Sequence, residues 1–259
     1  MDLGIRDRKA LVCASSQGLG YACALALAQE GCEVWLNGRN DEKLQAAAQR
    51  LREATGAVVH AVAADLNTEA GRAALVAACP EPDILVNNNA GPPPGKLEQW
   101  DHATWLAALE SNLLAAALLM RALIPGMRAR RFGRIVNITS AMVKSPLPVM
   151  GLSTAARAGL TALSKALSRQ AVVDNVTINN LLPERIDTPR QEFMAQRMMK
   201  EQGITRDEAR AQIAATIPAG RMGTPEEFGA ACAFLCGALA GYISGQNLQL
   251  DGGAYDGLV

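Results

Sequence analysis

The stretch KALVCASSQGLG, residues 9–20, decides the fold of this chain. It begins as a short apolar strand pattern and ends where an apolar helical pattern starts, over residues 19–30, with Gly31 as its stop signal. Gly18 and Gly20 let the backbone approach a bound group closely, and the helix after them offers free N–H groups and the positive end of its dipole. A turn before any helix favours glycine, but the position after a first strand predicts a pyrophosphate-binding loop.

Strand and helix patterns alternate along the rest of the chain. Further strands are predicted at 33–37, 57–63, 83–87, 134–138, 177–182 and 247–250, and further helices at 41–54, 67–78, 103–130, 153–172 and 224–237. Asn67 is the predicted N-cap of the helix at 67–78. This alternation predicts an α/β fold, a Rossmann-like doubly wound parallel sheet of about seven strands with helices on both faces. We expect residues 1–259 to form a single domain, because no linker interrupts the pattern.

The composition excludes several classes of protein. Of 259 residues, 49% are hydrophobic and 19% charged, which supports a packed core and excludes a wholly disordered chain. The 25 basic and 25 acidic residues cancel and aromatic residues make up only 4%, so nucleic acid is not an expected partner. We see no secretory signal and no run of about 18 apolar residues, and we expect a cytoplasmic protein without a membrane partner.

The cysteines and histidines form no metal-binding pattern. Only Cys232 and Cys236 lie close together, at helical spacing, and the chain has just two histidines. We therefore expect no metal site and six buried, reduced thiols. The cysteines are Cys13, Cys23, Cys32, Cys79, Cys232 and Cys236.

The end of the second predicted strand bears on cofactor choice. An NAD-binding site usually has an acidic residue here for the ribose diol, whereas this chain has Gly38 followed by Arg39. A guanidinium pairs with the 2′-phosphate of NADP through charge-assisted hydrogen bonds. A solvated arginine at a helix start is the plainer reading, but the position favours NADP(H) over NAD(H).

These motifs resemble the compact, roughly 250-residue type of the short-chain dehydrogenase/reductase (SDR) family along nearly the whole chain. Residues 13–20 are similar to its T-G-x-x-x-G-x-G loop, although Cys13 and Ala14 replace the leading Thr-Gly. Residues 87–91 resemble its N-N-A-G segment with one extra asparagine, which leaves the register ambiguous. Residues 179–188 resemble N-x-x-x-P-G-x-x-x-T, with Glu184 in place of the glycine. Segments 133–140, 220–227 and 245–253 match further family signatures.

The resemblance implies a site and an assembly. It implies a small carbonyl or alcohol substrate, hydride transfer with NADP(H), and a homo-oligomer, a tetramer or a dimer. Asn112 and Ser140 would be catalytic, Asn112 as anchor of a water relay and Ser140 by orienting the substrate oxygen. The implied cofactor-binding residues are Ala14, Ser16, Gln17, Gly18, Leu19, Gly20, Arg39, Asp65, Leu66, Asn88, Ala90, Arg157, Pro183, Ile186 and Thr188.

The chain departs from the family at the proton donor. The resemblance expects a tyrosine thirteen residues after Ser140 and a lysine four residues later, but these positions hold Ser153 and Arg157. A serine hydroxyl is a far weaker acid than a phenol, and an arginine keeps its proton at neutral pH. Losing a general acid typically lowers the rate about 10²- to 10⁴-fold. Ser153 and Arg157 could still orient a carbonyl or stabilise an oxyanion.

Other residues are candidates for the missing acid. Lys144 follows Ser140 in the loop expected to border the substrate, and Tyr255 lies on the C-terminal tail. A solvated lysine and a tail tyrosine remote from the site are the plainer readings. Tyr21 is expected to pack on the first helix, and Tyr242 fits an aromatic position of the C-terminal signature.

The polar stretch at 184–217 is the predicted substrate lid. Met194, Met198 and Met199 in it suit either an apolar ligand or packing against the core. The predicted function is that of an NADP(H)-dependent oxidoreductase with an atypical proton-donor site. A catalytically impaired cofactor-binding or regulatory protein is the alternative, and a non-redox lyase or isomerase is the third hypothesis.

Overall fold

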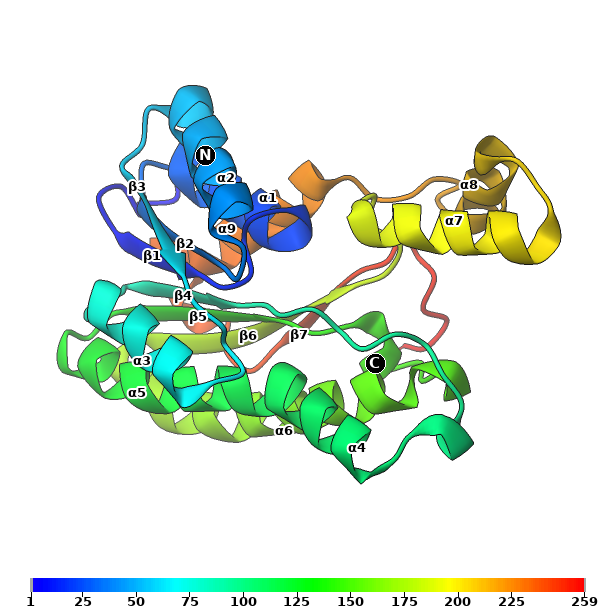
Figure 1. Ribbon diagram of the computed structural model, residues 1–259. Helices are drawn as coiled ribbons and strands as arrows, with labels where there is room; N and C mark the ends of the chain where they lie inside the picture. Colours follow the sequence, from blue (N-terminus) through cyan, green and yellow to red (C-terminus); the bar gives the residue numbers. More distant parts are fainter. Residues whose placement is uncertain (1, 259) are drawn as a thin grey trace.

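The computed structural model describes residues 2–258 and contains one seven-stranded parallel sheet in the order β3-β2-β1-β4-β5-β6-β7 (Figure 1). The order reverses between β1 and β4, and in open α/β sheets such a switch point is where ligands bind at the carboxyl ends of the strands. This confirms the predicted α/β fold. The strands are β1 (Lys9–Val12), β2 (Glu33–Gly38), β3 (Val59–Ala63), β4 (Ile84–Asn87), β5 (Gly133–Ile138), β6 (Val176–Pro183) and β7 (Asn247–Leu250).

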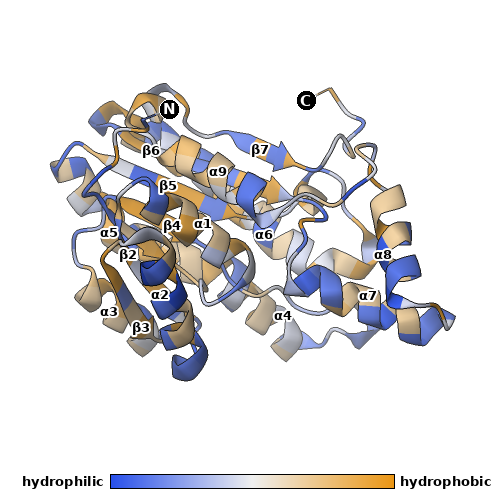
Figure 2. Ribbon diagram, turned by 90° about the horizontal axis from the view of Figure 1, so that it is seen from above, coloured by the Kyte–Doolittle hydropathy of each residue, from blue (hydrophilic) through white to orange (hydrophobic). Residues whose placement is uncertain are grey.

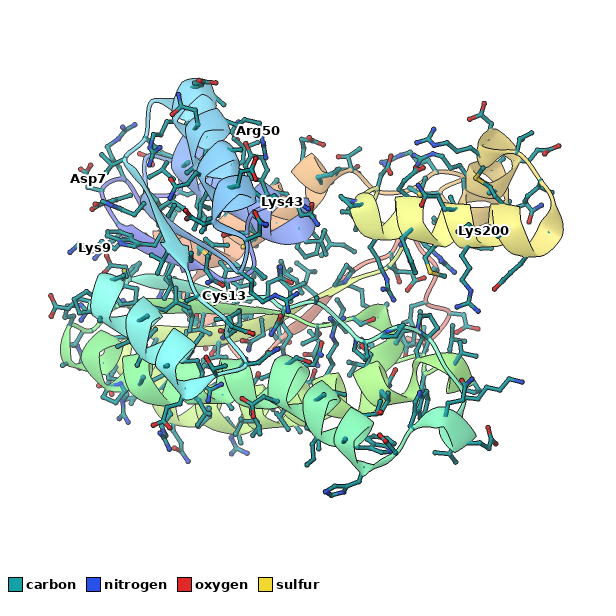
Figure 3. The ribbon with its side chains drawn as sticks, in the orientation of Figure 1. Asp7, Lys9, Cys13, Lys43, Arg50 and Lys200 are labelled. Atoms are coloured by element: carbon teal, nitrogen blue, oxygen red, sulfur yellow. The ribbon has the colours of Figure 1, made fainter. Side chains whose placement is uncertain are left out.

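Helices cover both faces of the sheet (Figure 1). The helices α1 (Gly18–Gln29), α2 (Asp41–Thr55) and α9 (Pro225–Cys236) enclose one apolar core with the sheet. The helices α3 (Glu69–Ala78), α5 (Ala115–Ala129) and α6 (Gly151–Ala171) enclose a second core on the opposite face. All six cysteines are free and buried, as expected. Cys13 lies among the side chains close to the sheet in Figure 3.

The helix predicted at 103–130 is not continuous α-helix. It consists of α4 (His102–Leu109), a π-helical turn η2 (Glu110–Leu114) and α5. Hydrophobic spacing does not distinguish i→i+4 from i→i+5 hydrogen bonding over one turn, so this interruption was missed. As a whole, 102–129 is long and apolar enough to cross a membrane, which is weak evidence since core helices pass the same test. Its buried face, including Leu119, Met120 and Leu123, packs in the second core.

One further prediction of local structure needs correction, and one segment without a predicted local structure is now defined. The N-cap of α3 is Thr68, whose Oγ1 accepts a hydrogen bond from the Gly71 amide at 3.0 Å, and not Asn67. A threonine caps a helix as Asn does, so both residues were compatible with the pattern. The segment 184–217 is largely helical, with α7 (Pro189–Gln202) and α8 (Arg206–Ala215).

The helices α7 and α8 stand apart from the two layers (Figure 1, yellow). They pack on each other through a small cluster of Ala195, Ala209 and Ile213. Hydrophilic residues colour much of α7 and of α2, while the central strands are mostly apolar (Figure 2). Arg210 pairs with Asp187 at 2.6 Å, which ties α8 to the segment that follows β6. Lys200 projects from α7 (Figure 3).

Four asparagines form a ladder across four adjacent strands, near the carboxyl ends of β4 and β5, in the middle of β6 and at the start of β7. Asn87 pairs in register with Asn137, Asn137 with Asn180, and Asn180 with Asn247. The side-chain amides bond in one direction, with Nδ2 to Oδ1 distances of 2.8, 3.2 and 2.8 Å. Asn137 also donates to Ser164 Oγ of α6 at 2.9 Å. The ladder satisfies polar groups in the interior and fixes the register of β4 to β7.

Candidate active site

A cleft of about 1110 Å³ opens at the carboxyl ends of the strands and extends to α7. All predicted cofactor-binding residues line it except Gly20, and so do Ser140 and Ser153. Asn112 borders a separate small cavity of about 20 Å³, which Arg157 shares with the cleft. The fold therefore brings nearly all of the predicted site into one continuous space.

The first loop requires glycine at two positions, for different structural reasons. Gly18 has φ +61°, and a β-carbon added there would meet only Thr188 Cβ at 3.9 Å, so this glycine provides both the turn and open space. At Gly20 a β-carbon would lie 2.5 Å from the Ala14 carbonyl oxygen, so this glycine permits close packing of α1 on the loop. Asn88 Nδ2 donates to the same Ala14 oxygen at 3.1 Å.

Arg39 lies at the far end of the cleft, where β2 ends. Its side chain is exposed, and Ser16 and Asp65 line the cleft with it. The buried Asn37 holds this end together, because it accepts from the Ala14 amide at 3.1 Å and donates to Ala64 O at 3.0 Å. A guanidinium thus stands at the position where we predicted recognition of a 2′-phosphate.

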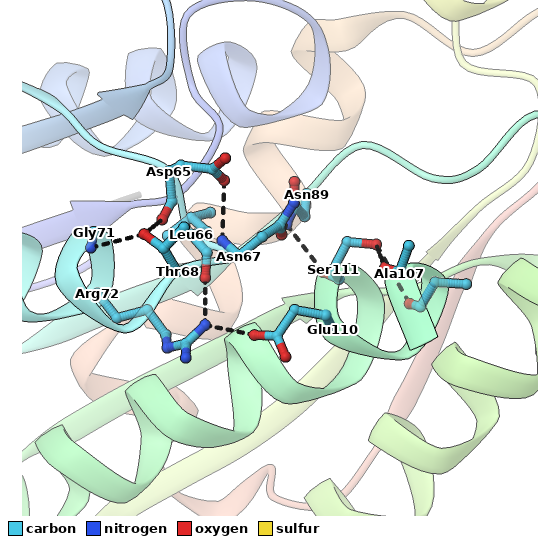
Figure 4. A network of polar contacts seen from close by, with 11 residues as sticks. Asp65, Leu66, Asn67, Thr68, Gly71, Arg72, Asn89, Ala107, Glu110 and Ser111 are labelled. Atoms are coloured by element: carbon cyan, nitrogen blue, oxygen red, sulfur yellow. Dashed lines mark hydrogen bonds and ion pairs between the residues drawn. The ribbon is translucent and has the colours of Figure 1, made fainter. Parts of the chain in front are cut away.

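A polar network links the loop after β3 to the π turn (Figure 4). Arg72 Nη1 donates to Leu66 O at 2.7 Å and pairs with Glu110 at 2.6 Å. Asn89 Nδ2 donates to Ser111 O at 3.0 Å. Asp65 and Leu66 are therefore positioned through the same contacts that fix the start of the π turn.

The π turn brings Asn112 to Arg157. Asn112 Oδ1 accepts from Arg157 Nε at 3.1 Å, and Arg157 Nη1 donates to Thr139 O at 2.8 Å. Burial, with a smaller contribution from the positive charge of Arg190, lowers the pKa of Arg157 to about 10. Arg157 of α6 therefore remains a cation at neutral pH, held between the π turn η2 and the residue that follows β5.

Ser153 and Arg157 converge on Gly91. A β-carbon at Gly91 would lie 3.3 Å from Arg157 Nη2 and 3.5 Å from Ser153 Oγ. Ser153 is buried, with 4% of its surface exposed. Ser140, in contrast, lies just beyond β5, and its Oγ accepts from the Met142 amide at 3.2 Å. Two hydroxyls and one guanidinium therefore border the same end of the cleft.

Neither of the other candidate acids lines the cleft. Lys144 Nζ lies 5.0 Å from the centroid of the Tyr255 ring, so these two residues contact each other. Tyr21 lies against Arg50, and Tyr242 is exposed. In the predicted lid, Met194 and Met198 line the cleft and also pack on the α7–α8 cluster, whereas Met199 only packs there.

Sequence reasoning assigned no role to six charged residues of the cleft wall, three of which lie shortly after β6. Glu184, Arg185 and Arg190 follow β6 and line the cleft. The one available signal was Glu184, which stands where the resembling motif has glycine. The two arginines lie in a polar segment whose helices the pattern did not resolve, so their position depended on the fold.

Comparisons with known proteins agree with this architecture. A family model described as enoyl-(acyl carrier protein) reductase matches residues 13–255. The NADPH-dependent reductase BacG of Bacillus subtilis is 32% identical over 95% of this chain and 97% of its own. Dehydrogenase/reductase SDR family member 4 of Bos taurus is 33% identical over 96% of this chain and 87% of its own.

Solved structures give the same result. L-sorbose reductase from Gluconobacter frateurii, complexed with NADPH and L-sorbose, superposes with a TM-score of 0.95 at 33% identity, covering 100% of both chains. With a family model and relatives that span nearly its whole length, and a fold that coincides with a solved reductase, the chain belongs to the short-chain dehydrogenase/reductase family of oxidoreductases.

Proposed function

We propose that this protein is an NADP(H)-dependent oxidoreductase that interconverts a small carbonyl compound and its alcohol, with Ser153 and Arg157 in place of the Tyr–Lys pair. The observation that carries the proposal is the single cleft lined by the glycine loop, Arg39 and Ser140. The NADPH-dependence of BacG and the NADPH bound by L-sorbose reductase support the choice of cofactor.

The described residues fit such a dinucleotide. The open space at Gly18 and the start of α1 suit a pyrophosphate, because the first N–H groups of a helix have no intrahelical partner and Gln17, Gly18 and Leu19 line the cleft. Arg39 suits the 2′-phosphate, and Asp65 with Leu66 the adenine. Pro183, Ile186 and Thr188 would border the nicotinamide. When bound, the cofactor supplies or accepts the hydride.

In this proposal each catalytic side chain has one task. Ser140 donates a hydrogen bond to the substrate oxygen and orients it. Arg157 is held by Asn112 and Thr139, and its Nη2 presents positive charge beside Ser153. A fixed cation in a partly buried site stabilises negative charge that develops on the oxygen, since it needs no reorganisation when the reaction occurs.

The test combines binding with turnover. We expect NADPH to bind more tightly than NADH in isothermal titration calorimetry. We expect NADPH oxidation with at least one member of a panel containing L-sorbose, a 3-oxoacyl thioester and small ketones and aldehydes. Ser140→Ala should lower that rate about 10²-fold or more. Tight NADPH binding without turnover would instead favour a regulatory protein, and a product formed without cofactor consumption would favour a lyase or isomerase.

A further inference from the structure

We propose that Glu184 is the general acid that protonates the substrate oxygen, in place of the tyrosine that the family has at the position of Ser153. This inference rests on the proposed function. Glu184 lines the cleft directly after β6, and its side chain is only 15% exposed. A carboxyl group that is mostly shielded from water and borders the reaction space is suited to proton transfer.

The sheet register places Glu184 at the catalytic end of the cleft. Ile138 pairs with Leu181, and the Thr139 amide donates to Leu181 O at 2.9 Å. Continued by two residues, this parallel register places Ser140, just beyond β5, beside Pro183, the last residue of β6, which Glu184 follows directly. Both residues line the cleft there.

The turn that carries Glu184 is fixed on both sides. The Glu184 amide donates to Leu250 O of β7 at 3.0 Å, and the Gly223 amide donates to Arg185 O at 3.1 Å. Arg185 has φ +53°, a left-handed conformation that costs energy for a residue with a β-carbon. These contacts hold the backbone of the turn in one place, and the ion pair with Arg185 at 3.1 Å restrains the carboxyl.

The other residues of the cleft wall leave few alternatives. Among the described residues 2–258, no tyrosine, histidine or cysteine lines the cleft. Its other carboxyl groups lie elsewhere, Asp65 beyond β3 and Glu201 exposed near the end of α7. Lys96 is exposed on the loop before η1 (Leu97–Gln99). Cys13 lies behind the cleft, and burial raises its pKa to about 12.

Burial of Glu184, more than the charges around it, favours the protonated carboxyl. Burial raises its pKa above the ordinary 4.5, the Arg185 guanidinium at 3.1 Å lowers it, and Asp251 raises it, with burial the largest effect. Arg185 comes from the same turn and Asp251 from the segment after β7. The net direction of the pKa is upward, which favours the protonated form that a general acid requires.

In the proposed step, hydride transfer to the carbonyl carbon is accompanied by proton donation from Glu184. A C–H bond forms at the carbonyl carbon with the hydride given up by NADPH, which is oxidised to NADP⁺, while the C=O π electron pair moves to oxygen. The Glu184 O–H bond breaks and its proton joins that oxygen, giving the alcohol. A proton from the bulk solvent then regenerates the Glu184 carboxylic acid, so that the reduction consumes one proton in all. In the reverse direction the carboxylate accepts the alcohol proton.

The deciding experiment compares Glu184→Gln, Glu184→Asp and the control Glu226→Gln, whose side chain is exposed on α9. With the best substrate of the panel, we expect Glu184→Gln to lower kcat about 10²-fold or more and to abolish the decline in rate at high pH, while NADPH affinity is unchanged. Glu184→Asp should keep that pH profile at reduced rate, and Glu226→Gln should match the wild type.

Two further readouts separate proton donation from a structural role. In ¹³C NMR of glutamate-labelled protein, the carboxyl resonance missing from Glu184→Gln should titrate at higher pH than the ordinary glutamates. Adding Ser153→Tyr with Arg157→Lys to Glu184→Gln should restore part of the rate, because it supplies a phenol. Wild-type turnover that Glu184→Gln leaves unchanged would overturn this inference alone. Absence of turnover in the wild type would overturn the proposed function and the inference with it.

Discussion

Arg39 is the residue that decides between the two nicotinamide dinucleotides in our proposal. We expect Arg39→Ala to weaken NADPH binding about 10- to 100-fold and to leave NADH binding nearly unchanged, because only NADPH offers a 2′-phosphate to the guanidinium. Calorimetric titration with both dinucleotides measures this. Arg169→Ala, an exposed arginine on α6, is the matched control. An equal loss for both dinucleotides would contradict the assignment.

The raised pKa of Glu184 also predicts that the free energy of unfolding depends on pH. Its pKa is raised in the folded state, mainly by burial, so the folded protein binds more protons than the unfolded chain above pH 4.5. Its contribution to stability is therefore fully present below 4.5 and decreases as pH rises through the folded-state pKa. Glu184→Gln should gain stability relative to wild type in urea unfolding as the pH rises from 4.5 through the raised folded-state pKa of Glu184. A difference independent of pH would contradict the raised pKa.

At the scale of elements, the asparagine ladder and the π turn connect the sheet to the site. Asn137 lies at the centre of the ladder, with partners on β4, β6 and α6. The π turn connects the helical layer to the site, since it places Asn112 where its Oδ1 accepts a hydrogen bond from Arg157 Nε. Both features place polar side chains inside the molecule, where hydrogen bonds offset the cost of burial. Among the described residues, the buried Asn87 Oδ1 at the start of the ladder has no such partner.

Asn137→Leu should destabilise the protein by about 3 kcal/mol or more, because it leaves several buried polar groups without partners. Thr177→Val is the matched control on the neighbouring strand. The Thr177 hydroxyl is buried and among the described side chains has no hydrogen-bond partner, so its removal should be neutral or stabilising by about 1 kcal/mol. Urea unfolding monitored by circular dichroism measures both. Similar losses in the two variants would refute the role of the ladder.

At the scale of the whole molecule, we propose that 184–217 acts as the lid. Trypsin should cleave at Arg197 and Lys200 of α7 in the free protein, and saturating NADPH should slow this cleavage about 10-fold or more, because closure removes the open state. Mass spectrometry identifies the sites. Cleavage at Lys43 and Arg50 of α2 is the internal control and should not change. Uniform protection of all four sites would indicate general stabilisation rather than closure.

A homo-oligomer, a tetramer or a dimer, remains our prediction for the assembly. Leu106 of α4 and Leu114 of the π turn are 53% and 41% exposed on the long helical run, and such a surface suits a partner helix. Light scattering after gel filtration should give two or four times the mass of the chain. Leu106→Lys with Leu114→Lys should lower it. A monomeric wild type would rule out the prediction.

The sequence by itself determined the fold and most of the cleft. The glycine loop after the first strand and the alternation of patterns identify a parallel doubly wound sheet, because local periodicity reports which faces are buried. Arg39, Ser140 and the glycines could be placed at one edge, since the carboxyl ends of parallel strands meet there. The predictions of Asn67 as a helix N-cap and of a continuous helix at 103–130 were wrong, because patterns of burial do not define the structure of single turns.

Only the tertiary structure decided which polar side chains meet. The contact of Arg157 with Asn112 joins residues 45 positions apart, and the ladder joins four strands. Glu184 showed in the sequence only as a departure from a motif, and its burial beside Arg185 and Asp251 follows from how β6 and β7 pair. Burial and charge act through space, so the acid–base properties of this site depend on the packed molecule rather than on local sequence.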